Sequence, residues 1–311
     1  MSRLKFSVFS DIHYNPGVSF SGDEAHLEII QKRAEREGCD FIISGGDFTH
    51  GPHRDVVQNY LKMYNEFHIP SYHCLGNHDT DKTPLAETLR RYNMPDKYYY
   101  FDCKGYRIIV CDPNYFLEDG IYHHFELGNY YSKMSSGSLR GIIPPEQKEW
   151  LRETIDASEY PCILISHESF EREANGIHNL AEIRELINAA NRKKPHSVLM
   201  CINGHYHRDN IRIIDNVLYF DLNSCSFDYI SNAHDYFPKE MCDKYSSLRH
   251  TVFFNDPIHA VVTVEGTTIT IDGMESSMFM GINREHTDNP LYDSMGRPVV
   301  PRVQSAKLTL G

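Results

Sequence analysis

Short apolar runs alternate with amphipathic stretches along the chain up to about residue 225. The apolar runs have the length of strands, and the amphipathic stretches carry apolar residues at helical spacing among charged ones. Buried strands are predicted at residues 4–10, 39–46, 69–76, 161–166 and 197–203. Helices are predicted at residues 23–38, 54–67, 84–92, 144–157 and 180–193. Such alternation is typical of a sheet whose strands are mainly parallel.

Strands alone are predicted from about residue 210 onward. Their apolar runs lie at residues 210–215, 216–224, 250–256, 259–266 and 267–273. An earlier pair of runs, residues 97–103 and 106–112, flanks Lys104-Gly105 and predicts a hairpin. We therefore expect an α/β (α+β) fold in which a mainly parallel sheet packs against a second, antiparallel sheet.

Two segments lack clear periodicity. Residues 113–141 are rich in Tyr, His, Gly and Ser, and a loop of this length is usually functional or mobile. Residues 281–311 carry Pro, Gly and polar residues, which indicates an extended arm on the body or a partly disordered one. We predict one domain at residues 1–280, with residues 113–141 as an insertion loop, followed by a C-terminal extended arm.

The composition narrows the class of protein. The net charge of −12 disfavours binding to a nucleic-acid polymer, although a nucleotide stays a candidate ligand. No apolar run approaches the roughly 18 to 20 residues that a membrane helix needs, so no membrane contact is predicted. Cleavage of a signal peptide would remove the first strand, and the eight cysteines contain no Cys-x-x-Cys pair. We expect a cytoplasmic protein with buried, reduced thiols; the sequence indicates no oligomeric state.

Polar residues follow each of the five buried strands of the first part of the chain. They are Asp11 and His13, Asp47, Asn77 with His78 and Asp79, His167, and His205 with His207. In open α/β sheets, sites assemble at the carboxyl ends of the strands. We therefore expect these side chains to meet at one edge.

Each motif alone is a weak signal. Asp11 and His13 are more often a surface pair, Asp47 after two glycines is a turn signal, and His167 alone is more often structural. The motifs together are a much stronger signal, because a string such as Gly-Asn-His-Asp alone matches a given position by chance only about once in 10⁵ to 10⁶. The whole set, in this order and at strand ends, predicts a metal site.

The ligand types indicate which metals fit. Two carboxylates, one amide oxygen and four imidazoles form a mixed oxygen and nitrogen set, which suits manganese, iron or zinc. Seven ligands are too many for one small ion but suit two divalent or trivalent ions that share a bridging carboxylate. Two ions about 3.5 to 4 Å apart can hydrolyse phosphate esters, because they bind the phosphoryl oxygens and turn a bridging water into hydroxide.

The motif series Asp-Ile-His, Gly-Gly-Asp, Gly-Asn-His-Asp, Ser-His and Gly-His-Tyr-His spans residues 11–207 and resembles the calcineurin-like metallophosphoesterase superfamily. The resemblance implies a four-layer αββα sandwich of two mixed β-sheets flanked by helices. Within the superfamily, the series is similar to the bacterial cyclic-nucleotide phosphodiesterase type and related small-molecule phosphodiesterases. It departs at His167-Glu168, where many relatives carry a second histidine or a nearby proline; this affects the substrate-side wall rather than the metals.

The resemblance also implies residue roles. One metal would be held by Asp11, His13, Asp47 and His207, and the second by Asp47, Asn77, His167 and His205. Asp47 would be the bridge. His78 would not be a ligand; it would stabilise developing charge and protonate the leaving group, and Asp79 would hydrogen-bond His78 and orient it.

Substrate contacts are predicted from two aromatic segments. Residues 113–141 contain six aromatic residues with His123 and His124, and the second segment contains Phe227, Tyr229, Tyr236 and Phe237. Such rings can stack on a base, a sugar or an aryl group, or they can simply cover the sheet edges. His50 and His53 follow Asp47 and either contact a substrate phosphate or are solvated.

The sequence favours a metal-dependent phosphodiesterase for small molecules that forms no covalent intermediate. A phosphomonoesterase, a nucleotide pyrophosphatase or a protein phosphatase of the same fold is the first alternative. The insertion at residues 113–141 favours a covered pocket and hence a small-molecule phosphate ester. A catalytically inactive scaffold is the alternative of another class, and the presence of all seven ligands and His78 argues against it.

Overall fold

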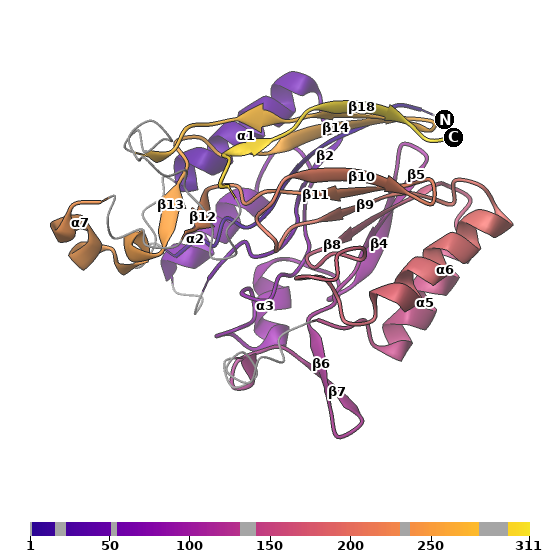
Figure 1. Ribbon diagram of the computed structural model, residues 1–311, viewed down its shortest axis with the longest axis horizontal. Helices are drawn as coiled ribbons and strands as arrows, with labels where there is room; N and C mark the ends of the chain where they lie inside the picture. The colour runs from indigo at the N-terminus through magenta and orange to yellow at the C-terminus, as the bar shows by residue number, and fades with distance from the viewer. Residues whose placement is uncertain (1, 16–22, 51–54, 131–140, 231–236, 280–297) are drawn as a thin grey trace.

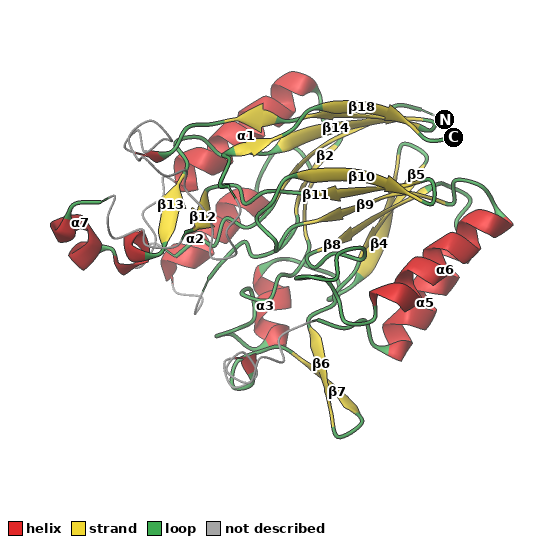
Figure 2. Cartoon of the chain, viewed as in Figure 1, coloured by secondary structure: helices red, strands yellow, loops and turns green. Residues whose placement is uncertain are grey.

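Two facing β-sheets with helices on their outer faces form the molecule (Figure 1; Figure 2). The computed structural model describes residues 2–15, 23–50, 55–130, 141–230, 237–279 and 298–311. Each of the two large sheets has six strands. Among the described residues, every helix is too short or too polar to span a lipid bilayer.

The first sheet has the strand order β18-β15-β14-β1-β2-β3. Its strands are β1 (Leu4–Phe9), β2 (Phe41–Ser44), β3 (Ser71–His73), β14 (Ala260–Glu265), β15 (Thr268–Asp272) and β18 (Ala306–Thr309). β1, β2 and β3 are parallel, whereas β14, β15 and β18 continue the sheet with antiparallel pairing. The carboxyl ends of β1 and β2 therefore lie at the same edge.

The second sheet has the strand order β10-β11-β9-β8-β5-β4. Its strands are β4 (Tyr99–Cys103), β5 (Tyr106–Val110), β8 (Cys162–Ser166), β9 (Val198–Asn203), β10 (Asn210–Ile214) and β11 (Val217–Asp221). β5, β8, β9 and β11 are parallel, and the predicted hairpin forms as the antiparallel pair β4 and β5.

Both sheets are thus mixed, and the sandwich of two mixed sheets is confirmed. The expectation of one mainly parallel and one antiparallel sheet is wrong, because the late strands divide between the two sheets. β10 and β11 extend the second sheet, whereas β14 and β15 extend the first.

Buried apolar residues fill both faces of the central strands. In β8, Ile163 and Ile165 face the core between the sheets, and Cys162 and Leu164 face the outer helices. Because side chains alternate along a strand, burial of both faces requires the continuous apolar runs seen in the sequence. Each fully buried Ile or Leu contributes roughly 1.5–3 kcal/mol to the stability of the fold.

Helices cover the outer face of each sheet (Figure 1). α1 (Asp23–Glu37) and α2 (Asp55–Asn65) pack on the first sheet, and α3 (Leu85–Arg91) adds partly buried leucines to the same cluster. α5 (Pro145–Asp156) and α6 (Leu180–Lys193) pack on the second sheet. The five predicted helices are all present at these positions.

Two segments differ from the sequence-based expectations. Within residues 113–141, strands β6 (Tyr115–Glu118) and β7 (Ile121–His124) form a hairpin that projects from the body (Figure 1). Its turn is Asp119-Gly120, and both residues have positive φ, as a two-residue hairpin turn of type I′ requires. A short helix, α7 (Lys239–Lys244), interrupts the region where only strands were expected.

The C-terminal segment contains two further strands. Its residues 281–297 lie outside the described part of the chain, but β17 (Arg302–Val303) pairs with β16 (Met274–Glu275), and β18 pairs with β15. The last described residues therefore lie on the body as the edge of the first sheet. The domain boundary at residue 280 stays a prediction.

Candidate metal centre

The candidate ligands lie just after the central parallel strands of both sheets. Asp11 and His13 follow β1, and Asp47 follows β2 in the first sheet, whereas His167 follows β8 in the second sheet. Backbone hydrogen bonds tie the loops together: Asp11 N–H donates to Gly46 O at 3.0 Å and His13 N–H to Asp47 O at 2.8 Å. The site therefore lies at the end of the sandwich where the carboxyl ends of these strands, from both sheets, come together.

The backbone at these positions is unusual. Five of the seven predicted ligands have left-handed φ values: Asp11 (57°), His13 (52°), Asp47 (48°), His205 (63°) and His207 (47°). A non-glycine residue in this region costs on the order of 1–3 kcal/mol and persists only where its surroundings hold it. Such strain clusters at functional sites, and here it turns successive side chains toward one point.

Six of the seven predicted ligands gather in two groups. Asp11, His13 and His207 form one group, and Asp47, His167 and His205 form the other, with ligand atoms within 4.8 Å of one another in each. Asp47 Oδ2 also lies 3.4 Å from His13 Nε2 and 3.1 Å from His167 Nε2, so one carboxylate oxygen lies between the two groups. This arrangement suits two ions with Asp47 between them; the assignment of each ligand stays a prediction.

The donor atoms fit a pair of metal ions. His13 Nε2, Asn77 Oδ1 and His167 Nε2 are buried and have no hydrogen-bond partner among the described residues. Buried polar atoms are normally paired, so three such atoms on predicted ligands call for a ligand. Nitrogen and oxygen donors together match manganese, iron or zinc.

Neighbouring groups orient two of these atoms. His167 Nδ1 lies 2.9 Å from Gly45 O, which fixes its proton on Nδ1 and leaves Nε2 to bind an ion. Asn77 Nδ2 donates to the Tyr130 hydroxyl at 2.6 Å, which fixes the amide and leaves its buried Oδ1 without a hydrogen-bond partner among the described residues. Tyr130 comes from the predicted insertion, which gives that segment a part in building the centre.

The carboxylates and histidines shift each other's pKa values. Burial raises the pKa of Asp11, but His167 and His207 outweigh it and hold that pKa well below its usual value. Burial lowers the pKa of His167, but Asp47 and Asp11 raise it to about 10. The site therefore concentrates negative charge that a proton or a cation neutralises.

Two glycines allow the ligand loops to approach closely. A Cβ atom on Gly76 would overlap the backbone nitrogen and Oδ1 of Asp47, and one on Gly204 would overlap the Ser10 hydroxyl. The loops after β3 and β9 can therefore reach the carboxylates only because these residues lack side chains.

His78 is oriented by a different aspartate from the one predicted. Its Nδ1 lies 3.1 Å from Asp81 Oδ2, and its backbone N–H donates to Asp47 Oδ1 at 2.7 Å. Asp79 instead accepts hydrogen bonds from Gly76 N (2.7 Å), Thr49 N (3.0 Å) and the Tyr92 hydroxyl (2.5 Å). Burial, with Asp47 adding to it, raises the pKa of Asp79 to about 7. The prediction that Asp79 hydrogen-bonds His78 is wrong; Asp79 holds the loop backbone.

The sequence reasoning missed Asp81 and Tyr130 as partners of the centre. Asp81 follows Asp79 by two residues, but it lies in a turn, where the direction of a side chain does not follow from its spacing. Tyr130 was one of six aromatic candidates, and nothing in its sequence context singled it out.

The aromatic candidates divide into two classes. Phe116, Phe125 and Tyr130 form a small buried cluster, and Phe237 is buried at the α7 end of the large apolar cluster. Tyr229 is 40% exposed, and its ring stacks on His207 with centroids 5.4 Å apart, so it offers a face beside the centre. Tyr236 and His53 lie outside the described residues.

Three more candidates have defined neighbours. Phe227 is buried, and its ring packs edge-on against His13 and His207. His124 anchors the hairpin, with Nε2 2.8 Å from Asp112 Oδ2 and Nδ1 2.6 Å from Phe125 O. His123 stacks on Phe116 at 5.3 Å between ring centroids. Of these three residues, only Phe227 packs against predicted metal ligands.

Comparisons with known proteins point in one direction. A family model described as calcineurin-like phosphoesterase matches residues 4–209. A dimetal phosphatase from Danio rerio is similar in structure, with a TM-score of 0.62 and 12% identity over 89% of this chain and 99% of that chain. GAP50, the anchor in the inner membrane complex of Plasmodium, has a TM-score of 0.56 and 13% identity over 99% of this chain and 89% of that chain. No curated protein matches the chain. At these identities, the structural likeness shows the fold alone.

Proposed function

The chain belongs to the calcineurin-like phosphoesterase family, and we propose that it is a phosphodiesterase that hydrolyses small-molecule phosphate esters with two metal ions. Membership makes it a metallophosphoesterase, an enzyme that cleaves phosphate esters. The observation that carries the proposal is the convergence of two buried ligand groups around Asp47, with His78 beside them.

The chain's own residues bind, orient and supply a proton. When bound, two metal ions supply Lewis-acid chemistry, polarising the phosphoryl group and generating hydroxide from water. Asp47 holds the two ligand groups together and also fixes the backbone of His78. Because Asp81 pairs with Nδ1 of His78, Nε2 is the atom that can hold a proton for the leaving oxygen.

The charges beside the centre favour a diester over a monoester. A monoester is dianionic near neutral pH and is best held by additional free cations, whereas a diester carries a single charge. Arg208, next to His207, is already paired with the buried carboxylate of Asp228. This cation is therefore engaged within the protein, which supports a substrate of lower charge.

The exposed ring of Tyr229 supports a substrate with a planar part. It lies beside His207, and aromatic faces stack on bases and aryl groups. We therefore place a nucleotide or an aryl ester among the candidate substrates, with manganese, iron or zinc as the metal.

The test compares two synthetic substrates. The protein is stripped of metal, reloaded with manganese and given bis-p-nitrophenyl phosphate or p-nitrophenyl phosphate. We expect metal-dependent turnover that prefers the diester, and loss of both turnover and bound metal in Asp47→Asn, because that residue contacts both ligand groups. Preference for the monoester would make the protein a phosphatase. No turnover of either substrate with two ions bound would favour the scaffold alternative.

We also propose that the protein works in the cytoplasm. All eight cysteines lie among the described residues, and all are free thiols. Seven of them are buried, which suits a reducing compartment. Fusion of the full chain to a fluorescent protein tests the location directly.

A further inference from the structure

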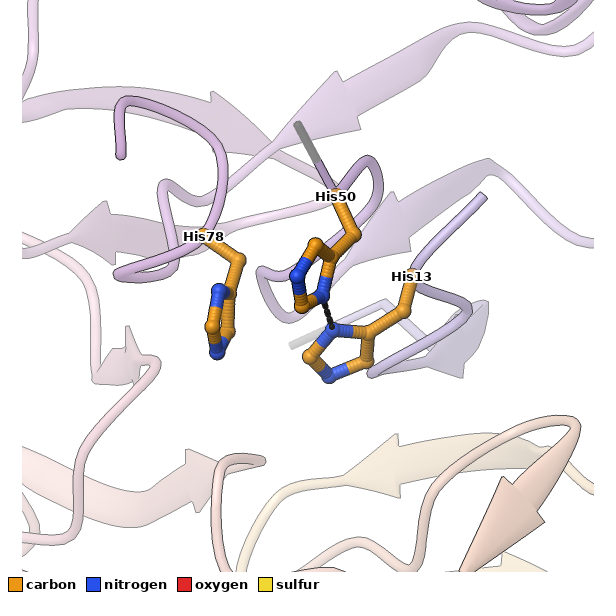
Figure 3. A group of neighbouring side chains, drawn as sticks. All are labelled: His13, His50 and His78. Atoms are coloured by element: carbon orange, nitrogen blue, oxygen red, sulfur yellow. Dashed lines mark hydrogen bonds between the residues drawn. The ribbon is translucent and has the colours of Figure 1, made fainter. Parts of the chain in front are cut away.

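His50 contacts two residues of the candidate centre, although it belongs to neither predicted ligand set. Its Nδ1 lies 3.2 Å from His13 Nδ1, and its ring stacks on His78 with centroids 4.2 Å apart and planes 17° apart (Figure 3). The backbone N–H of His50 donates to Tyr14 O at 3.2 Å. The loop after β1 therefore fixes the start of this side chain.

The position of one proton follows from the two contacts of His13. Its Nε2 is the buried atom that faces Asp47 and lacks a hydrogen-bond partner among the described residues, so it is the atom for a metal ion. A nitrogen that binds metal carries no proton, and the proton of the neutral ring must then lie on Nδ1. His13 Nδ1 is therefore the donor, and His50 Nδ1 is the acceptor.

We propose that His50 is a positioning residue that accepts the His13 Nδ1 proton and thereby holds Nε2 toward the metal, while its ring supports His78. The proposal rests on the proposed function in that His13 is taken as a ligand. Metal-binding histidines usually donate their other N–H to a carboxylate, a carbonyl or water, and this neighbour tunes metal affinity. Here a second histidine takes that place.

The rings of His13, His50 and His78 could instead hold a third metal ion, because one ligand atom from each lies within 4.8 Å of the others. That arrangement would require His13 to bind metal through both nitrogens and so to lose both ring protons. The 3.2 Å separation of the two Nδ1 atoms is a hydrogen-bond distance. The geometry thus favours a shared proton over a third ion.

Two substitutions of His50 distinguish the effect of its hydrogen-bond acceptor from the effect of its ring. In His50→Asn, the amide oxygen takes about the place of Nδ1, so an acceptor remains; in His50→Phe, the ring remains but the acceptor is lost. His68→Phe, at an exposed position, controls for removal of a histidine. We expect His50→Phe to bind manganese about 10- to 100-fold more weakly in competition with a chelator, and His50→Asn to lie within about threefold of the unaltered protein.

Nitrogen-15 NMR of the zinc-loaded, unaltered protein gives a readout that needs no variant. We expect the His13 proton on Nδ1 and the zinc on Nε2. The opposite arrangement, or equal metal affinity in His50→Phe and the unaltered protein, would overturn the proposal. A third bound equivalent in the unaltered protein that is lost in His50→Phe would replace it with the third-ion site. Absence of hydrolysis by the unaltered protein would refute the proposed function but leave this NMR result intact.

Discussion

His78 is a buried histidine whose charged form is favoured by its neighbours. Burial lowers its pKa, but Asp47 and the hydrogen bond to Asp81 outweigh this and raise it. Because the net shift is upward, more of the side chain carries the second proton near neutral pH in the metal-free protein than in a free histidine. The hydrogen bond to Asp81, which is not a predicted ligand, favours the charged form and suits His78 to give a proton to a leaving alkoxide.

Replacing His78 by alanine should therefore separate chemistry from metal binding. Metal content should stay near that of the unaltered protein, because the predicted ligand set does not include His78. Turnover of diesters with poor leaving groups should fall by about 10² to 10⁴-fold, whereas p-nitrophenyl esters, which need little protonation, should be affected less. Elemental analysis and rates across a series of leaving groups measure the two effects. Loss of one metal equivalent would show that His78 is a ligand.

The element that sets the geometry of the centre is the tight loop after each strand. A glycine precedes the ligand in several of these loops, and at Gly76 a Cβ atom would overlap Asp47. A small enlargement at such a position moves a loop rather than a single side chain.

Gly76→Ala should consequently damage stability and metal binding together. We expect the free energy of unfolding to fall by about 1–3 kcal/mol, with weaker metal binding because Asp47 is displaced. Gly311→Ala is the matched control: a Cβ there would lie 3.7 Å from Asn216 Oδ1, and its effect should stay within about 0.5 kcal/mol. Urea unfolding and chelator competition test both variants. Unchanged metal binding in Gly76→Ala would argue against contact between the two loops.

Buried strands were the elements that the sequence predicted best. β8 and β9 are covered on both faces, so their runs are apolar throughout and stop where the chain leaves the core. His167 and His205 stand at those stops, which is why strand ends located the candidate site. The hairpin of β6 and β7 was missed although its turn, Asp119-Gly120, has a hairpin sequence.

Features that depend on tertiary contacts could not be predicted from the pattern of apolar and polar residues. α7 has six residues, too few for a clear periodicity, and it is held by the buried Cys242. The contact between Asp81 and His78 depends on a turn whose shape follows from the packing around it. The pairing of β18 with β15 joins residues far apart in the chain.

At the scale of the whole molecule, the candidate centre joins the two halves of the sandwich. The first sheet supplies Asp11 and Asp47, and the second supplies His167 and His205. His205 N–H donates to Asp11 Oδ2 at 3.0 Å, which links the loops after β9 and β1 directly. The centre therefore depends on the packing of the two sheets against each other, and loss of global stability removes the site with it.

That global stability should fall in acid because of histidines that the fold buries in neutral form. Burial lowers the pKa of His73 and of His259 to about 3 each. His259 Nδ1 lies 2.6 Å from Pro257 O and donates to it. Its Nε2 is buried and has no hydrogen-bond partner among the described residues, so a proton added there would find no acceptor. The native state thus resists the second proton.

The sign of the pH dependence follows from these shifts. An unfolded histidine, with a pKa of about 6.5, takes up a proton below that pH, whereas the native ones stay neutral down to about pH 3. As the pH falls from about 6.5 to 3, each histidine therefore lowers the free energy of unfolding by about 1.4 kcal/mol for each unit of pH. Above about pH 6.5 it has no effect on stability.

His259→Phe removes one of these terms and gives the test. With a chelator present throughout, so that metal loss does not contribute, urea unfolding is measured at about pH 7 and about pH 5. The drop in unfolding free energy between the two should be about 2 kcal/mol smaller in His259→Phe than in the unaltered protein. His68→Phe, which removes an exposed histidine, should leave the drop unchanged. An equal drop in all three proteins would mean that His259 takes up its proton without unfolding the chain.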